Sequence, residues 1–317
     1  MEQNRHSIVE STQDILDQVR KVIVGKDSVL LWTLAAILAK GHVLLEDIPG
    51  VGKTTMAVAF SRVLGLDYNR VQFNPDVLPS DITGYSVLNQ ATGAMEYRPG
   101  AVLCNLFLAD ELNRATSRTQ SALLEAMEER QVTVDGVSHA VPSPFIVIAT
   151  QNPTGAAGTQ LLPDSQIDRF MISLSLGYPE PKDEITMLLQ RQGREPMAEV
   201  SPVLSAEDLM QMQKMVGETF VSEEIAAYIV DLADATRRSS LLLRGVSPRA
   251  TLALASMAKA IARLRGRDYV VPKDVQDCFT TTFSHRLQLS MEAEGQGLDA
   301  VHVLKTILTQ VSAPKLR

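Results

Sequence analysis

Residues 42–55 read HVLLEDIPGVGKTT, and this stretch decides the fold that the sequence predicts. It begins with an apolar run between Gly41 and a set of acidic, proline and glycine residues, which indicates a short buried strand. A glycine loop, a Lys-Thr pair and a helix-forming run over residues 55–64 follow. Strand, glycine loop, Lys-Thr and helix in this order predict a phosphate-binding P-loop.

The residue types of this loop are those that phosphate binding requires. The loop consists of Pro49, Gly50, Val51 and Gly52. Its glycines let successive backbone N–H groups point inward, and the positive end of the following helix faces the same anion. Lys53 would supply a charge for the β- and γ-phosphates, and the Thr54 hydroxyl would ligate Mg²⁺. Thr55 duplicates this hydroxyl, but helix packing is the favoured interpretation, because the residue directly after the lysine is the usual metal ligand.

Composition bounds the class of protein. The chain has 317 residues, of which 45% are hydrophobic and 21% charged, as expected for a globular protein of one to two domains. Its net charge of −7 argues against a general polyanion-binding surface. Two cysteines far apart indicate neither a zinc site nor a disulfide framework. The N-terminus has no signal-peptide core, and the apolar run 29–39 is too short to span a bilayer, so we expect a cytoplasmic protein.

The order of elements predicts an α/β fold followed by helices. Apolar strands are expected near 42–45, 67–73, 103–108 and 145–149, with helices between them and hairpin inserts near 85–98 and 131–141. This alternation predicts an α/β domain over residues 1–198 with a largely parallel sheet and ligands at the strand ends. From residue 205 onward five helical patterns follow without a convincing strand. They predict an all-helical second domain over residues 199–317.

A second group of candidate residues follows the strand LFLADE at 106–111. Asp110 would hold the Mg²⁺ shell, and Glu111 would orient the attacking water or accept its proton. The alternative is a strand that simply runs into an acidic helix start. Both interpretations predict a strand end at this point, and the P-loop upstream favours the functional one.

Three further polar residues are candidates, each with an ordinary alternative. The Asn152 amide suits both a γ-phosphate oxygen and a lytic water, whereas Asn-Pro is also a common turn. Arg169 lies in LPDSQIDRF, and Arg249 lies at a predicted helix start in GVSPR. An arginine fork matches phosphate oxygens, but an ordinary surface ion pair would also account for each of these two residues.

Several motifs in their correct order resemble the AAA+ ATPases, and closely the MoxR family among them. They are HVLLEDIPGVGKT, PSDITG, NLFLADELNRA, EAMEERQVTVDG, FIVIATQNP, LPDSQIDRF and GVSPRA. The strict P-loop pattern has glycine where this chain has Asp47, although an acidic pair before Pro-Gly is familiar in that family. The resemblance implies the following roles: Lys53 and Thr54 as Walker A, Asp110 and Glu111 as Walker B, Asn152 as sensor 1, Arg169 as arginine finger, Arg249 as sensor 2, and Val24 and Gly25 along the adenine.

The resemblance further implies an ATP- and Mg²⁺-dependent ring, expected to be a hexamer, that remodels client proteins with partners containing von Willebrand factor A domains. Whether Arg249 acts on its own subunit's nucleotide or a neighbour's is left open. A magnesium-chelatase-like subunit is an alternative with the same architecture. A nucleic-acid motor is a further alternative, but residues 131–144 contain no Lys or Arg and residues 85–100 contain only Arg98. We therefore expect no nucleic-acid partner.

Overall fold

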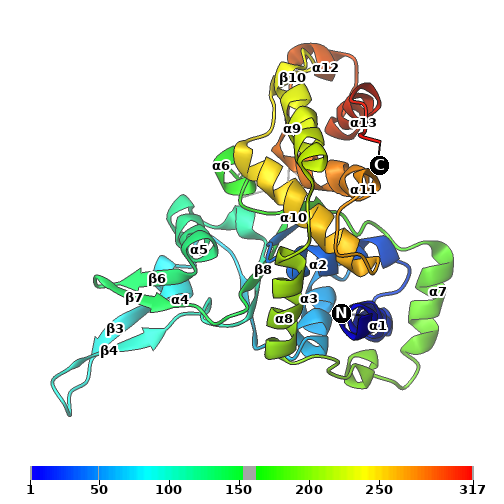
Figure 1. The fold of residues 1–317 in the computed structure, drawn as a ribbon. Helices are drawn as coiled ribbons and strands as arrows, with labels where there is room; N and C mark the ends of the chain where they lie inside the picture. The colour runs from blue at the N-terminus through cyan, green and yellow to red at the C-terminus, as the bar shows by residue number, and fades with distance from the viewer. Residues whose placement is uncertain (1, 49, 153–161, 316–317) are drawn as a thin grey trace.

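A five-stranded parallel sheet forms the centre of the molecule (Figure 1). The computed structural model describes residues 2–48, 50–152 and 162–315. The sheet order is β2-β5-β8-β1-β9. The strands are β1 (Val43–Glu46), β2 (Tyr68–Gln72), β5 (Leu106–Asp110), β8 (Ile146–Gln151) and β9 (Ile172–Leu174). Every residue of β5 and β8 is buried, because these inner strands have neighbours on both sides and packing on both faces.

The two faces of the sheet bury separate apolar cores. Along β1, Val43 and Leu45 belong to one core, and Leu44 between them belongs to the other. This follows from the alternation of side chains along a strand. Helices α1 (Glu2–Arg20), α2 (Asp27–Leu38) and α3 (Lys53–Val63) supply the first core. Helix α5 (Ser117–Glu129) supplies the second, so the predicted α/β fold with a parallel sheet is confirmed.

Both predicted hairpins are present. The first pairs β3 (Gly84–Leu88) with β4 (Met95–Pro99) after the short helix α4 (Pro79–Thr83), and it projects from the body (Figure 1). The second pairs β6 (Gln131–Val134) with β7 (Val137–Ala140). The Tyr97 ring stacks on the His139 ring with centroids 3.7 Å apart. The two hairpins are therefore joined into one projecting unit.

The predicted helical lid is also confirmed. It contains α8 (Ala206–Gly217), α9 (Glu223–Arg238), α10 (Pro248–Leu264), α11 (Pro272–Phe283), α12 (Met291–Gly295) and α13 (Ala300–Gln310). A short antiparallel pair, β10 (Leu242–Arg244) with β11 (Gln288–Leu289), lies within it and was not expected. Ser205, Ser222 and Ser247 each cap a helix, since each hydroxyl accepts a backbone N–H from the first turn.

The connection between sheet and lid contains elements that the sequence did not predict. They are α6 (Asp164–Ile167), strand β9, helix α7 (Pro181–Gln190) and the 3₁₀ turn η2 (Pro196–Glu199). Helix α7 has no buried residue and lies at the surface beside α1 (Figure 1). Among the described helices, none combines the length and the apolar composition that crossing a membrane requires.

Candidate active site

The glycine loop lies between the end of β1 and the start of α3, as predicted. Gly50 and Gly52 have φ of +87° and +98°, which a side chain disfavours. A Cβ on Gly50 would meet nothing within 4 Å, so backbone conformation rather than space requires glycine there. Val51 packs against the core, and Pro49 lies outside the described residues.

The Lys53 ammonium lies over this loop and is largely buried, with 7% of the residue exposed. Its Nζ donates to the carbonyl oxygens of Asp47 at 2.7 Å and Ile48 at 3.3 Å. Burial lowers the pKa of Lys53, while the nearby charges of Asp47, Asp110 and Glu111 act to raise it. The ammonium is therefore held in the loop by neutral acceptors that a more strongly charged ligand would displace.

Asp47, where the strict P-loop pattern has glycine, has a structural role that the sequence did not reveal. Its buried carboxylate accepts hydrogen bonds from Ser175 Oγ at 2.9 Å, from the backbone N–H of Leu176, and from that of Gly177 at 3.1 Å. These three donors follow β9 directly. The carboxylate therefore fastens the glycine loop to the chain that leads into α7.

The Asp110 carboxylate lies at the end of β5, the neighbour of β8 in the sheet. Its Oδ1 accepts a hydrogen bond from Thr150 Oγ1 at 2.7 Å, and its Oδ2 accepts one from Arg70 at 2.6 Å. Thr54, in the first turn of α3, is the other predicted metal ligand. Carboxylate and hydroxyl oxygens are the ligands that Mg²⁺ prefers, so this donor set fits the ion. Arg70 and Thr150 were not predicted.

Glu111 adopts a backbone conformation that is rare for a residue other than glycine, with φ of +57°. Its N–H donates to Thr150 Oγ1 at 2.8 Å. Its carboxylate accepts bonds from Arg114 at 2.9 Å and Asn152 Nδ2 at 3.3 Å. The Arg114 hydrogen bond, with a contribution from Asn152, holds the pKa of Glu111 below its usual value. The structure therefore brings the predicted residues Glu111 and Asn152 together and adds Arg114.

The Asn152 amide oxygen is a possible ligand contact. It is buried and has no hydrogen-bond partner among the described residues, although its Nδ2 is bonded to Glu111. A buried acceptor without a donor is costly, which is typical of a group that awaits a ligand or water. The Asn-Pro turn alone would not explain this orphaned oxygen.

The two predicted arginines lie together, but away from the glycine loop. Arg169 Nε bonds Glu128 at 2.8 Å, and Arg249 bonds the other oxygen of the same carboxylate. Arg169 precedes β9, and the N–H of Met171 next to that strand donates to the His42 carbonyl just before β1. This is the edge at which the parallel strands begin. Both arginines form ion pairs, as the surface alternative predicted, yet they converge on one carboxylate.

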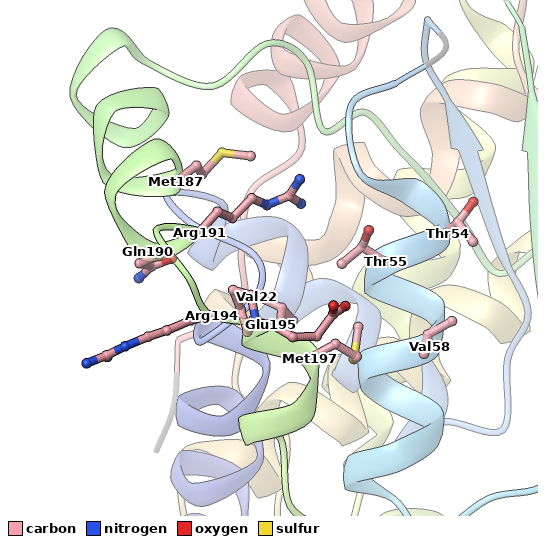
Figure 2. A pocket seen from close by; sticks show the side chains of 11 residues that line it. Val22, Thr54, Thr55, Val58, Met187, Gln190, Arg191, Arg194, Glu195 and Met197 are labelled. Carbon is pink, nitrogen blue, oxygen red and sulfur yellow. The ribbon is translucent and has the colours of Figure 1, made fainter.

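A cavity of about 470 Å³ adjoins the first turns of α3 (Figure 2). Thr54, Thr55 and Val58 line one side, so Thr55 faces open space and is not committed to packing. The opposite side is formed by the chain from Met187 to Met197, and Val22 also contributes.

Val24 and Gly25 do not line this cavity, but they closely follow Val22, which does. A Cβ on Gly25 would collide with the Asp183 carboxylate of α7, and Gly25 has φ of +72°. The segment 24–25 therefore needs glycine for both space and conformation. Its place beside Val22 and α7 is compatible with the adenine contact that the family resemblance implies.

Comparison with known proteins identifies the class. Residues 42–172 match the model of the ATPase family associated with various cellular activities (AAA), and residues 234–307 match the AAA lid domain. The matched regions contain the parallel sheet with its glycine loop and most of the helical lid. The chain is therefore an ATPase of the AAA class.

Similar full-length proteins narrow this class to a family. The chain is 38% identical to chaperone MoxR1 of Mycobacterium tuberculosis over 97% of this chain and 84% of that protein. It is 44% identical to uncharacterized protein YeaC of Bacillus subtilis over 95% and 94% of the two chains. A solved structure of a candidate ATPase from Cytophaga hutchinsonii superposes with a TM-score of 0.91, at 35% identity and 99% and 98% coverage. The chain belongs to the MoxR family of AAA ATPases.

Proposed function

We propose that this ATPase binds Mg²⁺-ATP at the edge where the parallel strands end, and completes its active site with arginines of a neighbouring subunit. We further propose that the resulting ring uses ATP hydrolysis to remodel partner proteins. The observation that carries the proposal is the separation of functional groups. Lys53, Asp110 and Glu111 gather at one edge of the sheet, and Arg169 and Arg249 gather at the other.

Residues of the same subunit would hold the nucleotide. Lys53 would exchange the loop carbonyls for phosphate oxygens, assisted by the loop N–H groups and the start of α3. Thr54 and Asp110 would hold Mg²⁺, which neutralises charge on the phosphates when bound. Glu111 is ionised at neutral pH, because its pKa is lowered, and is thus ready to orient water and take its proton. Asn152 would accept a hydrogen bond from the same water through its free amide oxygen, and its Nδ2 group would be the donor toward the γ-phosphate.

The two arginines would act in trans. β1 has four residues, which span roughly 13 Å from the edge near Arg169 to the edge near Lys53. This distance separates both arginines from the nucleotide site of their own subunit. Both guanidinium groups are partly exposed, with 28% and 42% of the side chains accessible, and both are held by Glu128. They are thus available to the phosphates of another subunit, where an arginine is worth about 10³–10⁵ in rate.

A contact between one edge and the opposite edge of the next copy is heterologous, and such contacts close into rings when the rotation permits. This supports a ring, and the family resemblance suggests six subunits in the cytoplasm. The exposed residues of the projecting hairpins include Tyr85, Leu88, Met95 and Val137. An apolar projection suits polypeptide clients better than a nucleic-acid backbone. A partner with a von Willebrand factor A domain is proposed from the resemblance alone.

The substitution Glu111→Gln tests this function. It keeps the shape of the site and removes the base, so we expect nucleotide binding near wild type and turnover reduced by roughly 10²-fold or more. The measurements are calorimetric ATP affinity and phosphate release. Glu125→Gln, on the exposed side of α5, is the matched control and should hydrolyse normally. Affinity capture with the Glu111→Gln protein under ATP should retain a client protein. Unchanged hydrolysis by Glu111→Gln would remove this residue from the mechanism.

A further inference from the structure

The wall of the cavity beside α3 carries two arginines that point in opposite directions. Arg191 caps the end of α7, and Arg194 follows three residues later. In Figure 2 the Arg191 guanidinium extends across the cavity toward Thr55, whereas the Arg194 side chain extends away from it. Neither residue was singled out in the sequence, because α7 itself was not predicted.

Arg191 has no bonded carboxylate. Within residues 2–48, 50–152 and 162–315, no hydrogen bond or ion pair joins its guanidinium to another side chain or carbonyl oxygen. Glu195 also lines the cavity, but it is not paired with Arg191 and lies lower along α3, near Val58 and Met197 (Figure 2). A cation that faces a cavity without a bonded carboxylate is suited to an anionic ligand.

The segment that carries Arg191 is fastened to the chain just before the glycine loop and to the chain just before α2. The Asp47 carboxylate binds the chain at residues 175–177. Lys26 Nζ donates to the Tyr178 carbonyl at 2.7 Å, and Asp183 packs against Gly25. Helix α7 therefore starts from a fixed position beside the loop, and its far end brings Arg191 to the opposite wall of the cavity from Thr55.

Two other arginines near the sheet are already paired with carboxylates. Arg249, the lid arginine expected from the sequence, lies at the edge where the parallel strands begin and is bound to Glu128. Arg70 lies at the edge where the parallel strands end and is paired with Asp110. Arg191 has no bonded carboxylate in the described part of the chain, and it lies across the cavity from the start of α3.

We propose that Arg191 binds the nucleotide of its own subunit, at the phosphates next to the ribose. This inference rests on the proposed function, because it assumes that the triphosphate lies at the start of α3. Thr54 marks the Mg²⁺ side of that site, and Thr55 lies one residue further along the helix, facing Arg191. Arg191 therefore meets the α- and β-phosphates and makes the same contact with ATP and ADP.

The test measures the affinities of ATPγS and ADP by isothermal titration calorimetry on the full chain. The variants are Arg191→Ala, Arg191→Gln, Arg191→Lys and the control Arg194→Ala. We expect Arg191→Ala and Arg191→Gln to weaken both nucleotides by roughly 10-fold or more, by the same factor for each. Arg191→Lys should recover part of the loss, and Arg194→Ala should stay within about twofold of wild type.

Three results would overturn the inference. They are unchanged affinities for Arg191→Ala and Arg191→Gln, a loss confined to ATPγS, and an equal loss for Arg194→Ala.

The wild-type protein and Lys53→Ala separate a failure of this inference from a failure of the proposed function. If wild type itself binds neither nucleotide, the ATP site is wrong; if wild type binds and Lys53→Ala does not, the site is right and only the role of Arg191 is in question. Thermal melting confirms that each variant is folded, which is expected because Arg191 is exposed.

Discussion

At the scale of single residues, the end of β5 is shaped by bonds that hold Glu111 in an unfavourable conformation. Its left-handed backbone costs on the order of 1–3 kcal/mol. The Thr150 hydroxyl accepts its N–H and donates to Asp110, so one side chain holds the Glu111 backbone and the Asp110 carboxylate. Arg114 and Asn152 then hold the Glu111 carboxylate itself. The proposed base is therefore placed and charged before a substrate arrives.

Arg114→Ala should move the acid limb of the rate–pH profile. A general base works when ionised, so the rate falls as the pH drops through its pKa. The Arg114 hydrogen bond is the largest cause that lowers the pKa of Glu111. Its removal raises that pKa, and the acid limb should shift to higher pH in kcat measurements at saturating Mg²⁺-ATP. Arg118→Ala, at the second residue of α5, is the control. An acid limb at the wild-type pH in Arg114→Ala would show that this ion pair does not tune the base.

At the scale of elements, β1 joins the two edges of the sheet. The glycine loop follows its end, and His42 at its start is buried between β8 and α5. The His42 Nδ1 accepts the N–H of Val147 at 2.9 Å, and Nε2 lies 3.3 Å from the Met127 carbonyl. The ring is therefore neutral with its proton on Nε2, because Nδ1 must remain an acceptor.

Acid should destabilise the fold through this histidine. Burial, with the nearby charge of Arg130, lowers the pKa of His42 from 6.5 to about 3. Between these values the unfolded chain binds a proton that the folded chain excludes, so stability falls as the pH drops below 6.5, by about 1.4 kcal/mol per pH unit. Urea denaturation at pH 7.5 and 5.5 measures this loss. His42→Gln should make the dependence less steep, and the exposed His302→Gln should not; the buried His285, whose pKa burial also lowers, accounts for the slope that is left. The same slope in His42→Gln as in wild type would contradict this assignment.

The elements also show what could be predicted from the sequence. The apolar strands β1, β5 and β8, the glycine loop and the Asp-Gly hairpin have strong local patterns, and all were predicted. Strand β9 has only three residues, and α7 exposes Ile185, Leu188 and Leu189, so neither has a local pattern linked to the core. The pairing of Arg169 and Arg249 with Glu128 joins residues 41 and 121 positions apart. No local pattern contains such a contact.

At the scale of the whole molecule, the proposed active site is divided between two surfaces. The start of α10 with α6 lies on one side of the molecule, and α7 with α1 lies on the other (Figure 1). The candidate nucleotide cavity adjoins α7, whereas the arginines adjoin α10. A single copy cannot bring these surfaces together, but neighbouring copies in the proposed ring would bring the arginines of one to the cavity of the next. Assembly and hydrolysis are therefore expected to depend on each other.

Mixing two inactive variants tests this division most directly. Lys53→Ala lacks phosphate binding and keeps its arginines, and Arg169→Ala lacks an arginine and keeps its glycine loop. Each alone should hydrolyse ATP at a small fraction of the wild-type rate. Native mass spectrometry would first verify that mixed rings form, and phosphate release would then be measured against the mixing ratio. The account predicts partial recovery of hydrolysis that is greatest near equal amounts of the two variants. Mixed rings that remain as inactive as either variant alone would contradict it.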